Sequence, residues 1–337
     1  MKRIYVTGAA GFIGFHLAEH LLDEGFIVHG FDGMTPYYDP ALKEARLARL
    51  TGRNGFTFTR GMLEGAGKLA ADIRAFRPDA IVHLAAQAGV RYSLEAPRSY
   101  LSANIEGTFN VMEAARDQGV KHLMLASTSS VFGANTEMPY RETDKADTQV
   151  SLYAATKKAT ENLSHSWAHL YNLPTTCFRF FTVYGPWGRP DMAPFKFTRA
   201  ILAGEPIEVY GQGDMYRDFT YVTDLVRALR LLIDHPPVRP ASPDQIAAGD
   251  SLSPVAPWRV VNVGNGEKVS LGDFIAAIEA AAGQQAVKKL MGMQKGDVVA
   301  TWADNGLLAR LTGYRPETSI REGMARFVAW YRDYFGF

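Results

Sequence analysis

The amino terminus of the chain carries a glycine-rich turn that strongly limits the folds available to it. A short apolar run at residues 4–6 leads directly into Thr7-Gly8-Ala9-Ala10-Gly11-Phe12-Ile13-Gly14. Apolar residues then recur at helical spacing through Leu17 and Leu21, which predicts a helix with one buried face. The three glycines allow a tight turn, close approach of the backbone to a pyrophosphate, and close packing of the helix on the strand. The segment therefore predicts the strand, turn and helix that open a dinucleotide-binding fold, although its spacing is Gly-x-x-Gly-x-x-Gly rather than Gly-x-Gly-x-x-Gly.

A second predicted strand at residues 26–31 ends on Asp32 and completes a βαβ unit. An acid at this position can accept hydrogen bonds from the adenosine ribose hydroxyls, and its charge repels a 2′-phosphate. The sequence thus favours NAD over NADP as the cofactor. The alternative interpretation of Asp32 is an ordinary turn residue at a strand end.

Strand-like and helix-like segments alternate along the first half of the chain, which predicts an α/β fold with a doubly wound parallel sheet of the Rossmann type. Ligands of such sheets bind at the carboxyl ends of the strands, so Leu84-Ala85-Ala86-Gln87 and Ser127-Thr128 are expected to line a cofactor cleft. A helix carrying Asn104 lies between two of the strands. The further strands are expected at residues 56–60, 80–84, 122–126 and 175–180.

Beyond about residue 180 the alternation loosens, which predicts a smaller, interleaved, mixed α/β substrate domain. Its segments include short strands at 207–210 and 259–263 and helices near 194–203, 223–234, 271–282 and 320–335. We expect the Rossmann domain to comprise residues 1–180, with returning segments at about 219–235 and 258–264. The substrate domain then comprises 181–218 and 265–337, and the Pro-, Ala- and Ser-rich segment 236–257 is expected to form an exposed insertion loop.

Tyr153 and Lys157 lie four residues apart, so on a helix they project from the same face. An adjacent ammonium favours the charged form of a phenol and lowers its pKa from about 10, which suits a general base. A hydroxyl such as that of Thr128 can share the proton of a substrate. A Tyr and a Lys at this spacing also occur often on helices without any chemical role.

Composition excludes several classes of function. The formal net charge is +1 over 337 residues with no Lys/Arg-rich run, so nucleic acid and anionic membranes are not expected partners. No apolar stretch is long enough to span a bilayer, and no signal peptide is apparent, so the protein is expected to be cytoplasmic. His165 and His169 are four apart without the Glu of a zinc hydrolase helix, so no metal is expected. The single cysteine, Cys177, is expected to be a buried, inert thiol.

The residues described above resemble those of the extended short-chain dehydrogenase/reductase family, and the resemblance covers essentially the whole chain. Four longer strings are similar, more narrowly, to those of bacterial UDP-glucuronate 4-epimerases. The strings are Asp32-Gly33-Met34-Thr35-Pro36-Tyr37-Tyr38-Asp39-Pro40, Ala85-Ala86-Gln87-Ala88-Gly89-Val90-Arg91-Tyr92-Ser93, Arg179-Phe180-Phe181-Thr182-Val183-Tyr184-Gly185-Pro186-Trp187-Gly188-Arg189-Pro190-Asp191-Met192 and Arg217-Asp218-Phe219-Thr220-Tyr221.

The resemblance implies a role for residues at matching positions. Tyr153 is expected to be the general base, Lys157 to lower its pKa and bind the nicotinamide ribose, and Thr128 to complete the proton path. Residues expected around NAD are Gly8, Gly11, Phe12, Ile13, Gly14, Asp32, Met62, Leu63, Leu84, Ala85, Ala86, Gln87, Asn104, Ser127, Tyr153, Lys157 and Phe180. Residues expected around a UDP-sugar are Arg91, Thr128, Ser129, Thr182, Arg189, Arg217 and Asp297.

Arg217 corresponds to the arginine that holds the diphosphate, and Asp297 to the acid near the uridine ribose. Arg91, Thr182 and Arg189 are the candidates for holding a sugar carboxylate, because a guanidinium can bind a planar carboxylate through two hydrogen bonds. The chain departs from the family where Met62 replaces an Asp that usually contacts the adenine amino group. We expect backbone groups of Met62 and Leu63 to contact the adenine instead.

The hydroxyl residues after Thr128 separate the activities of related enzymes. Sugar-nucleotide 4,6-dehydratases carry Asp-Glu there and UDP-glucuronate decarboxylases carry Glu, whereas this chain has Ser129 and Ser130. A serine without a partner is a poor acid or base near neutral pH. The expected activity is therefore C4 epimerisation of UDP-glucuronate through a 4-keto intermediate with bound NAD. A decarboxylase, another UDP-hexose 4-epimerase and a non-catalytic dinucleotide sensor are the alternatives, and the family resemblance implies a homodimer.

Overall fold

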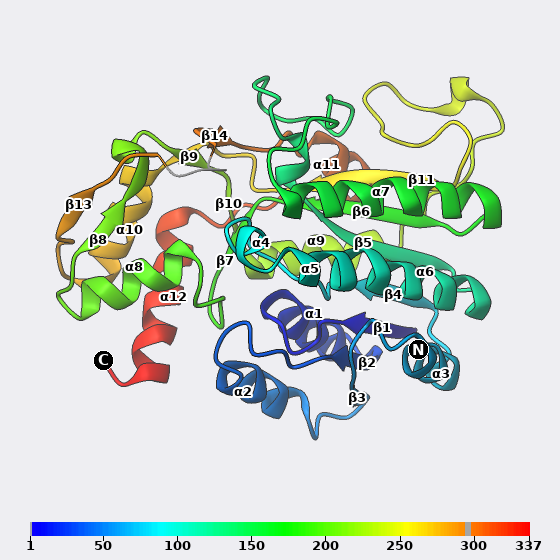
Figure 1. Ribbon diagram of the computed structural model, residues 1–337, viewed down its shortest axis with the longest axis horizontal. Coiled ribbons are helices and arrows are strands. Elements are labelled where there is room, and N and C mark those ends of the chain that lie inside the picture. Colours follow the sequence, from blue (N-terminus) through cyan, green and yellow to red (C-terminus); the bar gives the residue numbers. More distant parts are fainter. Residues whose placement is uncertain (1, 294–297) are drawn as a thin grey trace.

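Seven parallel strands form the central sheet of the computed structural model, which describes residues 2–293 and 298–337 (Figure 1). Their order is β11-β6-β5-β4-β1-β2-β3, so the doubly wound parallel sheet predicted from the sequence is confirmed. The strands are β1 Arg3–Thr7, β2 Ile27–Asp32, β3 Phe56–Arg60, β4 Ala80–His83, β5 His122–Thr128, β6 Thr175–Phe180 and β11 Trp258–Val263.

Alternate residues of these strands point to two separate apolar cores, one on each face of the sheet. Along β1, Ile4 and Val6 face the core that is shared with helices α1 and α9, while Tyr5 faces the core that is shared with α3 and α6. Both faces of a parallel sheet are buried in this way, which explains why its strands appear in the sequence as continuous apolar runs. The flanking helices are α1 Phe12–Asp23, α2 Ala41–Leu50, α3 Ala66–Phe76, α6 Gly107–Gln118, α7 Leu152–Tyr171 and α9 Val222–Ile233.

The strand order reverses between β1 and β4, because β1 pairs with β2 on one side and with β4 on the other. Thr7 lies beside His83 in this pairing, so the loops that follow the two strands leave the sheet at the same edge. A crevice opens at such a reversal point and is the usual ligand site of open α/β sheets.

A smaller lobe lies to one side of the sheet (Figure 1). Its core is built mainly from helices α8, α10 and α12, around aromatic residues such as Phe274 and Phe327. Serine caps begin two of these helices: Ser270 accepts a hydrogen bond from Asp273 N, and Ser319 accepts one from Glu322 N. Its elements are β7 Thr182–Tyr184, α8 Ala193–Leu202, β8 Ile207–Val209, β9 Tyr216–Arg217, β10 Phe219–Tyr221, β12 Val269–Ser270, α10 Leu271–Ala282, β13 Lys288–Leu290, β14 Ala300–Thr301 and α12 Ile320–Phe335.

Helix α11, Gly306–Thr312, packs with the first lobe even though the sequence assigns residues 265–337 to the substrate domain. Its Leu307 and Leu308 join the core formed by α1, α9 and one face of the sheet. The chain therefore returns to the Rossmann core once more than expected. The short length of α11 gives no periodic signal that could separate it from its neighbours.

The helix expected around Asn104 begins with π-helical rather than α-helical turns. Helices α4 Tyr92–Glu95 and α5 Pro97–Tyr100 precede a π-helix, η1, at Leu101–Glu106, and α6 then continues in the α-helical form. A π-helical segment contains one extra residue per turn and is common at functional sites.

The segment 236–257 contains one short 3₁₀ helix, η4 Pro243–Gln245, and otherwise has no helix or strand. It reaches back to α7, where His165 Nε2 lies 2.8 Å from Ser253 Oγ and His169 Nδ1 lies 2.7 Å from Val255 O. Both histidines are thus hydrogen-bonded to this loop. Within residues 2–293 and 298–337, no helix combines the length and apolarity that crossing a bilayer requires.

The packing of the smaller lobe leads to a stability prediction. Phe274 is fully buried and stacks on Phe219 with ring centroids 4.5 Å apart. Phe274→Ala should lower the free energy of unfolding by about 3–5 kcal/mol, because the lost contacts leave a cavity. Phe337→Ala is the control, since that side chain is 55% exposed. Denaturant titration compares them, and equal losses in the two variants would contradict the assignment of Phe274 to the core.

Candidate active site

A cleft of about 640 Å³ runs along the carboxyl ends of β1, β4, β5 and β6 and continues to the smaller lobe. This volume lies in the range of small-molecule sites, roughly 300–1,000 Å³. Most of the residues predicted from the sequence line it. They are Gly8, Gly11, Phe12, Ile13, Gly14, Asp32, Met62, Leu63, Leu84, Ala85, Ala86, Gln87, Ser127, Thr128, Ser129, Tyr153, Lys157, Phe180, Thr182, Arg189 and Arg217.

The glycine-rich turn has no room for side chains at the positions of Gly8 and Gly14. Gly8 has φ +74°, and Gly11 N donates a hydrogen bond to Gly8 O over 2.9 Å. A Cβ atom at Gly14 would lie 2.0 Å from Gly8 O, and one at Gly8 would lie 2.8 Å from Ala85 N. The backbone at the amino terminus of α1 therefore borders the cleft directly, which suits the close approach of a pyrophosphate.

The backbone holds Asp32 at the end of β2. Its two carboxylate oxygens accept hydrogen bonds from Ala10 N (3.0 Å) and Met34 N (2.8 Å). The carboxylate lines the cleft beside the glycine-rich turn. This placement fits a dinucleotide whose adenosine ribose hydroxyls face an acid.

Met62 and Leu63 border the same end of the cleft. The side chain of Met62 lies over Gly33, where an added Cβ would meet the sulfur at 2.5 Å. Leu63 is buried, and its carbonyl accepts a hydrogen bond from Asn110 Nδ2 over 2.9 Å. These contacts fix the loop after β3, so its backbone offers a rigid edge to a ligand.

Asn104 does not line the cleft but supports one of its walls from behind. Its Oδ1 accepts a hydrogen bond from Gln87 N over 2.8 Å, and its Nδ2 donates to Gln87 O and to Thr156 Oγ1. The residue is fully buried within the π-helix η1. It therefore connects the loop after β4 to helix α7, and its expected contact with a cofactor stays a prediction.

Tyr153 and Lys157 project from the first turns of α7 into the cleft, and Thr128 reaches it from the end of β5. Burial raises the pKa of Tyr153, and a hydrogen bond with Thr128 and the charge of Arg189 oppose that rise. Lys157 is not among the groups that lower it. Desolvation of the phenol therefore sets the direction of this shift, and the expectation that Lys157 lowers the pKa of Tyr153 stays a prediction.

The charge of Lys157 is itself affected by burial. Removal from water lowers the pKa of its ammonium to about 8, while Cys177 and Glu161 act in the opposite direction. Lys157 is thus a cation near neutral pH that can lose its proton only slightly above it. Burial also raises the pKa of the Cys177 thiol to about 12, which agrees with the expected inert cysteine.

Two hydroxyl residues follow Thr128 in a 3₁₀ helix, η2 Ser129–Phe132. The Thr128 hydroxyl caps this helix by accepting a hydrogen bond from Ser130 N over 3.2 Å. Ser129 and Ser130 both line the cleft, so the position that carries an acid in the related lyases is occupied by hydroxyls.

The guanidinium of Arg189 lines the cleft and is held by Asp191. Its Nε and Nη2 donate to the two carboxylate oxygens over 3.0 and 2.5 Å, and Tyr37 donates its hydroxyl to the same carboxylate over 3.0 Å. Although burial opposes it, the charge and hydrogen bonds of Arg189 lower the pKa of Asp191. The ion pair with Asp191 uses Nε and Nη2 of Arg189 and does not use its Nη1 donors.

The smaller lobe contributes Thr182 and Arg217 to the cleft. Arg217 Nη1 donates to the carbonyls of Tyr216 and Val299. Arg91 does not line the cleft, and its guanidinium lies over the ring of Tyr210 at 5.2 Å. Asp297 falls outside the described residues.

Sequence reasoning missed the roles of Tyr37, Lys43 and Asp191, all of which line the cleft. Tyr37 and Asp191 stood inside strings used for the family resemblance, but no spacing rule joins residues 154 positions apart. Lys43 donates a hydrogen bond to Thr35 O over 2.8 Å. Burial lowers the pKa of the Lys43 ammonium, and the charge of Asp32 opposes this change. The residues that the structure describes contain no group of three or more metal-ligating side chains.

Residues 4–246 match the NAD dependent epimerase/dehydratase family. A probable UDP-glucuronate 4-epimerase from Rhizobium meliloti (strain 1021) is 54% identical over 98% of this chain and 96% of its own length. The crystal structure of a UDP-glucuronic acid 4-epimerase from Bacillus cereus in complex with UDP-glucuronic acid and NAD is 30% identical, with a TM-score of 0.86 over 98% of this chain and 99% of that one.

A UDP-glucose 4-epimerase from Thermotoga maritima, solved with UDP-glucose, is 27% identical and has a TM-score of 0.85, covering 99% of both chains. The fold is thus shared by enzymes with different sugars. The choice of sugar must depend on individual residues of the cleft.

The tight turn at Gly14 leads to a prediction for dinucleotide binding. Gly14→Ala places a methyl group against Gly8 O, so the turn must open; the purified protein should lose bound dinucleotide and stability. Gly67→Ala is a matched helical control, since nothing lies within 4 Å of the added Cβ. Release of nucleotide on denaturation, measured by chromatography, tests both variants. Full dinucleotide content in Gly14→Ala would refute the proposed contact.

Proposed function

We propose that this chain, which belongs to the NAD dependent epimerase/dehydratase family, interconverts UDP-glucuronate and UDP-galacturonate by reversible oxidation at C4. The first lobe would hold NAD, and the smaller lobe would hold the UDP-sugar. The observation that carries the proposal is the meeting of Thr128, Tyr153 and Lys157 with Arg189 in one cleft. The relatives that act on UDP-glucuronate support the same substrate.

NAD, when bound, accepts hydride from C4 of the sugar and returns it. The residues suited to hold it are those of the glycine-rich turn, with Asp32 at the ribose hydroxyls and Lys157 toward the nicotinamide end. Tyr153, as the phenolate, takes the proton of the C4 hydroxyl and becomes the neutral phenol, and the hydrogen bond from Thr128 stabilises the phenolate before the transfer. Return of the same proton after the ketone has turned over gives the C4 epimer.

A 4-keto uronate is a β-keto acid, which loses carbon dioxide when its C5–carboxylate bond aligns with the carbonyl π system. We propose that Arg189 and Thr182 hold the carboxylate away from that alignment. The pairing of Arg189 with Asp191 supports this role, because it fixes the guanidinium through Nε and Nη2 and does not use Nη1. Thr182 lies at the start of β7 on the same wall of the cleft.

The alternatives differ in what they require of the cleft. A decarboxylase or dehydratase would need an acid where Ser129 and Ser130 lie. A 4-epimerase for neutral UDP-hexoses would not need a guanidinium such as that of Arg189. A dinucleotide sensor would not need Thr128, Tyr153 and Lys157 together, so we favour the uronate epimerase.

We also propose that the enzyme is a cytoplasmic homodimer. A shallow apolar hollow lies across α5, η1, α6 and α7, and Leu101, which lines it, is 50% exposed. Leu94, on α4 nearby, is 68% exposed. A second copy of the chain could cover these side chains. Light scattering of the purified protein gives the molar mass, and a monomer would contradict the proposal.

The reaction is tested by incubating the purified protein with UDP-glucuronate and identifying the nucleotide products. We expect UDP-galacturonate without added NAD, and a loss of at least about 100-fold in kcat for Tyr153→Phe, which removes the proton acceptor. Tyr171→Phe is the control, because Tyr171 lies near the other end of the same helix and is 46% exposed. UDP-xylose as the product would favour the decarboxylase, and no turnover of any UDP-sugar would favour the sensor.

The role of Arg189 is tested with Arg189→Ala. The variant should bind UDP-glucuronate at least about tenfold more weakly, because a charged hydrogen-bonding partner is lost, or release a UDP-pentose after decarboxylation of the intermediate. Arg321→Ala, at an exposed position on α12, should behave as the unchanged protein. Unchanged rate, affinity and product in Arg189→Ala would exclude Arg189 as the carboxylate ligand.

A further inference from the structure

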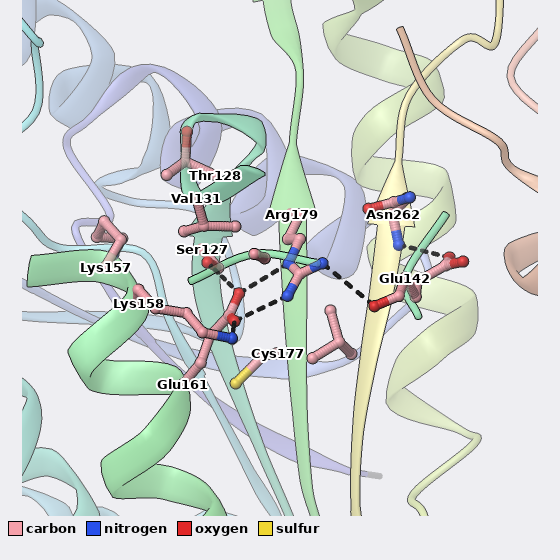
Figure 2. A network of polar contacts seen from close by, with 12 residues as sticks. Ser127, Thr128, Val131, Glu142, Lys157, Lys158, Glu161, Cys177, Arg179 and Asn262 are labelled. Atoms are coloured by element: carbon pink, nitrogen blue, oxygen red, sulfur yellow. Dashed lines mark hydrogen bonds and ion pairs between the residues drawn. The ribbon is translucent and has the colours of Figure 1, made fainter. Parts of the chain in front are cut away.

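Helix α7 carries a third ionisable residue on the face that bears Tyr153 and Lys157. Glu161 follows Lys157 by one turn and is 1% exposed, and Arg179 on β6 forms an ion pair with both of its oxygens (Figure 2). Burial of an ion pair is expensive, and such pairs often contribute little net stability. The position of this pair directly behind the reacting groups calls for a functional explanation.

The carboxylate of Glu161 is fully engaged. Oε1 accepts hydrogen bonds from Arg179 Nε (2.9 Å) and Ser127 Oγ (2.6 Å), and Oε2 accepts from Arg179 Nη2 (2.9 Å) and Lys158 Nζ (3.0 Å). Although burial opposes it, the charge of Arg179 and these hydrogen bonds lower the pKa of Glu161 to about 2. The group is therefore an anion throughout the neutral range.

Two contacts connect this anion to the reacting groups. Ser127 immediately precedes Thr128 at the end of β5, so its hydrogen bond to Glu161 ties the strand end to α7. The charge of Glu161 also acts on Lys157 one turn away, where it favours the protonated ammonium. The Glu161 side chain thus affects the position of Thr128 and the charge of Lys157.

We propose that Glu161 is a positioning residue of the reaction: its carboxylate fixes Thr128 relative to Tyr153 through Ser127 and keeps Lys157 charged. Arg179 supplies the counter-charge that makes a buried carboxylate tolerable, and Arg179 is itself fixed by donating to Glu142 O and by lying over the ring of Phe132 at 4.7 Å. The inference rests on the proposed function, because it assigns Glu161 to the support of that chemistry.

The charge of Lys157 links this role to pH. Because burial lowers the pKa of Lys157 to about 8, a reaction that needs the ammonium slows as the pH rises through that value. Loss of the Glu161 charge lowers this pKa further, so the alkaline limb of the rate profile moves to lower pH. The titratable groups that interact electrostatically with Lys157 are Glu161 from α7, Cys177 from β6 and His83 from β4. Tyr153 and Lys158 lie on the same helix, and Lys158 and Arg179 pair with Glu161.

The decisive variant is the double substitution Glu161→Gln and Arg179→Gln. It leaves no orphaned buried charge, so the protein should fold, but it lacks the carboxylate. We expect the alkaline limb to move down by about one pH unit and kcat to fall about tenfold or more with little change in KM. Arg179→Gln alone is the matched control: it also breaks the ion pair but keeps the carboxylate, which still accepts hydrogen bonds from Ser127 and from the Lys158 ammonium, so its alkaline limb should lie at or above the position in the unmodified protein.

A purely structural ion pair predicts a different result. The double variant would then keep the original pH profile and kcat, or both variants would show the same profile, and either outcome would overturn the proposal. Ser127→Ala separates the two effects, because it removes the tie to β5 but keeps the charge; it should lower kcat without moving the alkaline limb.

A measurement without turnover distinguishes failure of this inference from failure of the proposed function. In protein carrying ¹³C at the lysine Cε positions, the NMR signal that disappears in Lys157→Met identifies Lys157. Its pKa should be lower in the double variant than in the original protein whichever sugar is the substrate, and an unchanged pKa would overturn the electrostatic role of Glu161. Absence of turnover in the original protein would instead reject the proposed epimerase.

Discussion

The contact between helix α7 and strands β5 and β6 determines where the reacting side chains lie. Tyr153 and Lys157 come from the helix, whereas Thr128 comes from the end of β5, so their distances depend on how the helix sits on the sheet. Apolar packing alone would allow the helix to slide by small amounts, because hydrophobic contacts have no direction. The buried contact of Glu161 with Arg179 and Ser127 has both distance and direction (Figure 2). The ion pair is costly to bury, but it fixes the position of α7 on the sheet.

The smaller lobe is fixed by a second buried acid, which has no cationic partner among the residues that the structure describes. Asp218 is fully buried and accepts hydrogen bonds from the backbone N–H groups of Asn265, Gly266 and Ala303 and from the Thr220 hydroxyl. Burial raises its pKa, and these donors oppose the rise. Because Asp218 follows Arg217 directly, the same contacts fix the backbone that presents the arginine to the cleft. Each lobe therefore places its ligand-facing groups through a neighbouring carboxylate that does not itself line the cleft.

The sequence predicted the sheet well because most of its strands are apolar and buried on both faces, although the edge strand β3 alternates Phe and Thr and is not buried. The glycine-rich turn and Asp32 were also predictable, since their function requires particular residues at fixed spacing. Helices α2 and α3 were not predicted, and α11 was expected in the other domain, because short helices with many polar residues have weak periodicity. The contact of Tyr37 with Asp191 is invisible in the sequence, since it depends on how two distant loops fold. The rise in the pKa of Tyr153 on burial was not predicted, because spacing reveals a neighbouring charge but not desolvation.

Because the segment Leu101–Glu106 is π-helical, the direction in which Asn104 points depends on the number of residues in this helix as well as on their identity. An α-helix turns by about 100° per residue, so deletion of one residue here would restore regular α-helical hydrogen bonding and rotate Asn104 away from Gln87. The apolar residues of α6 would still match the core, but the buried Asn104 would lose its hydrogen bonds to Gln87 and Thr156. Insertions and deletions, which are usually tolerated only in loops, would in this helix act on the wall of the cleft while leaving the fold intact.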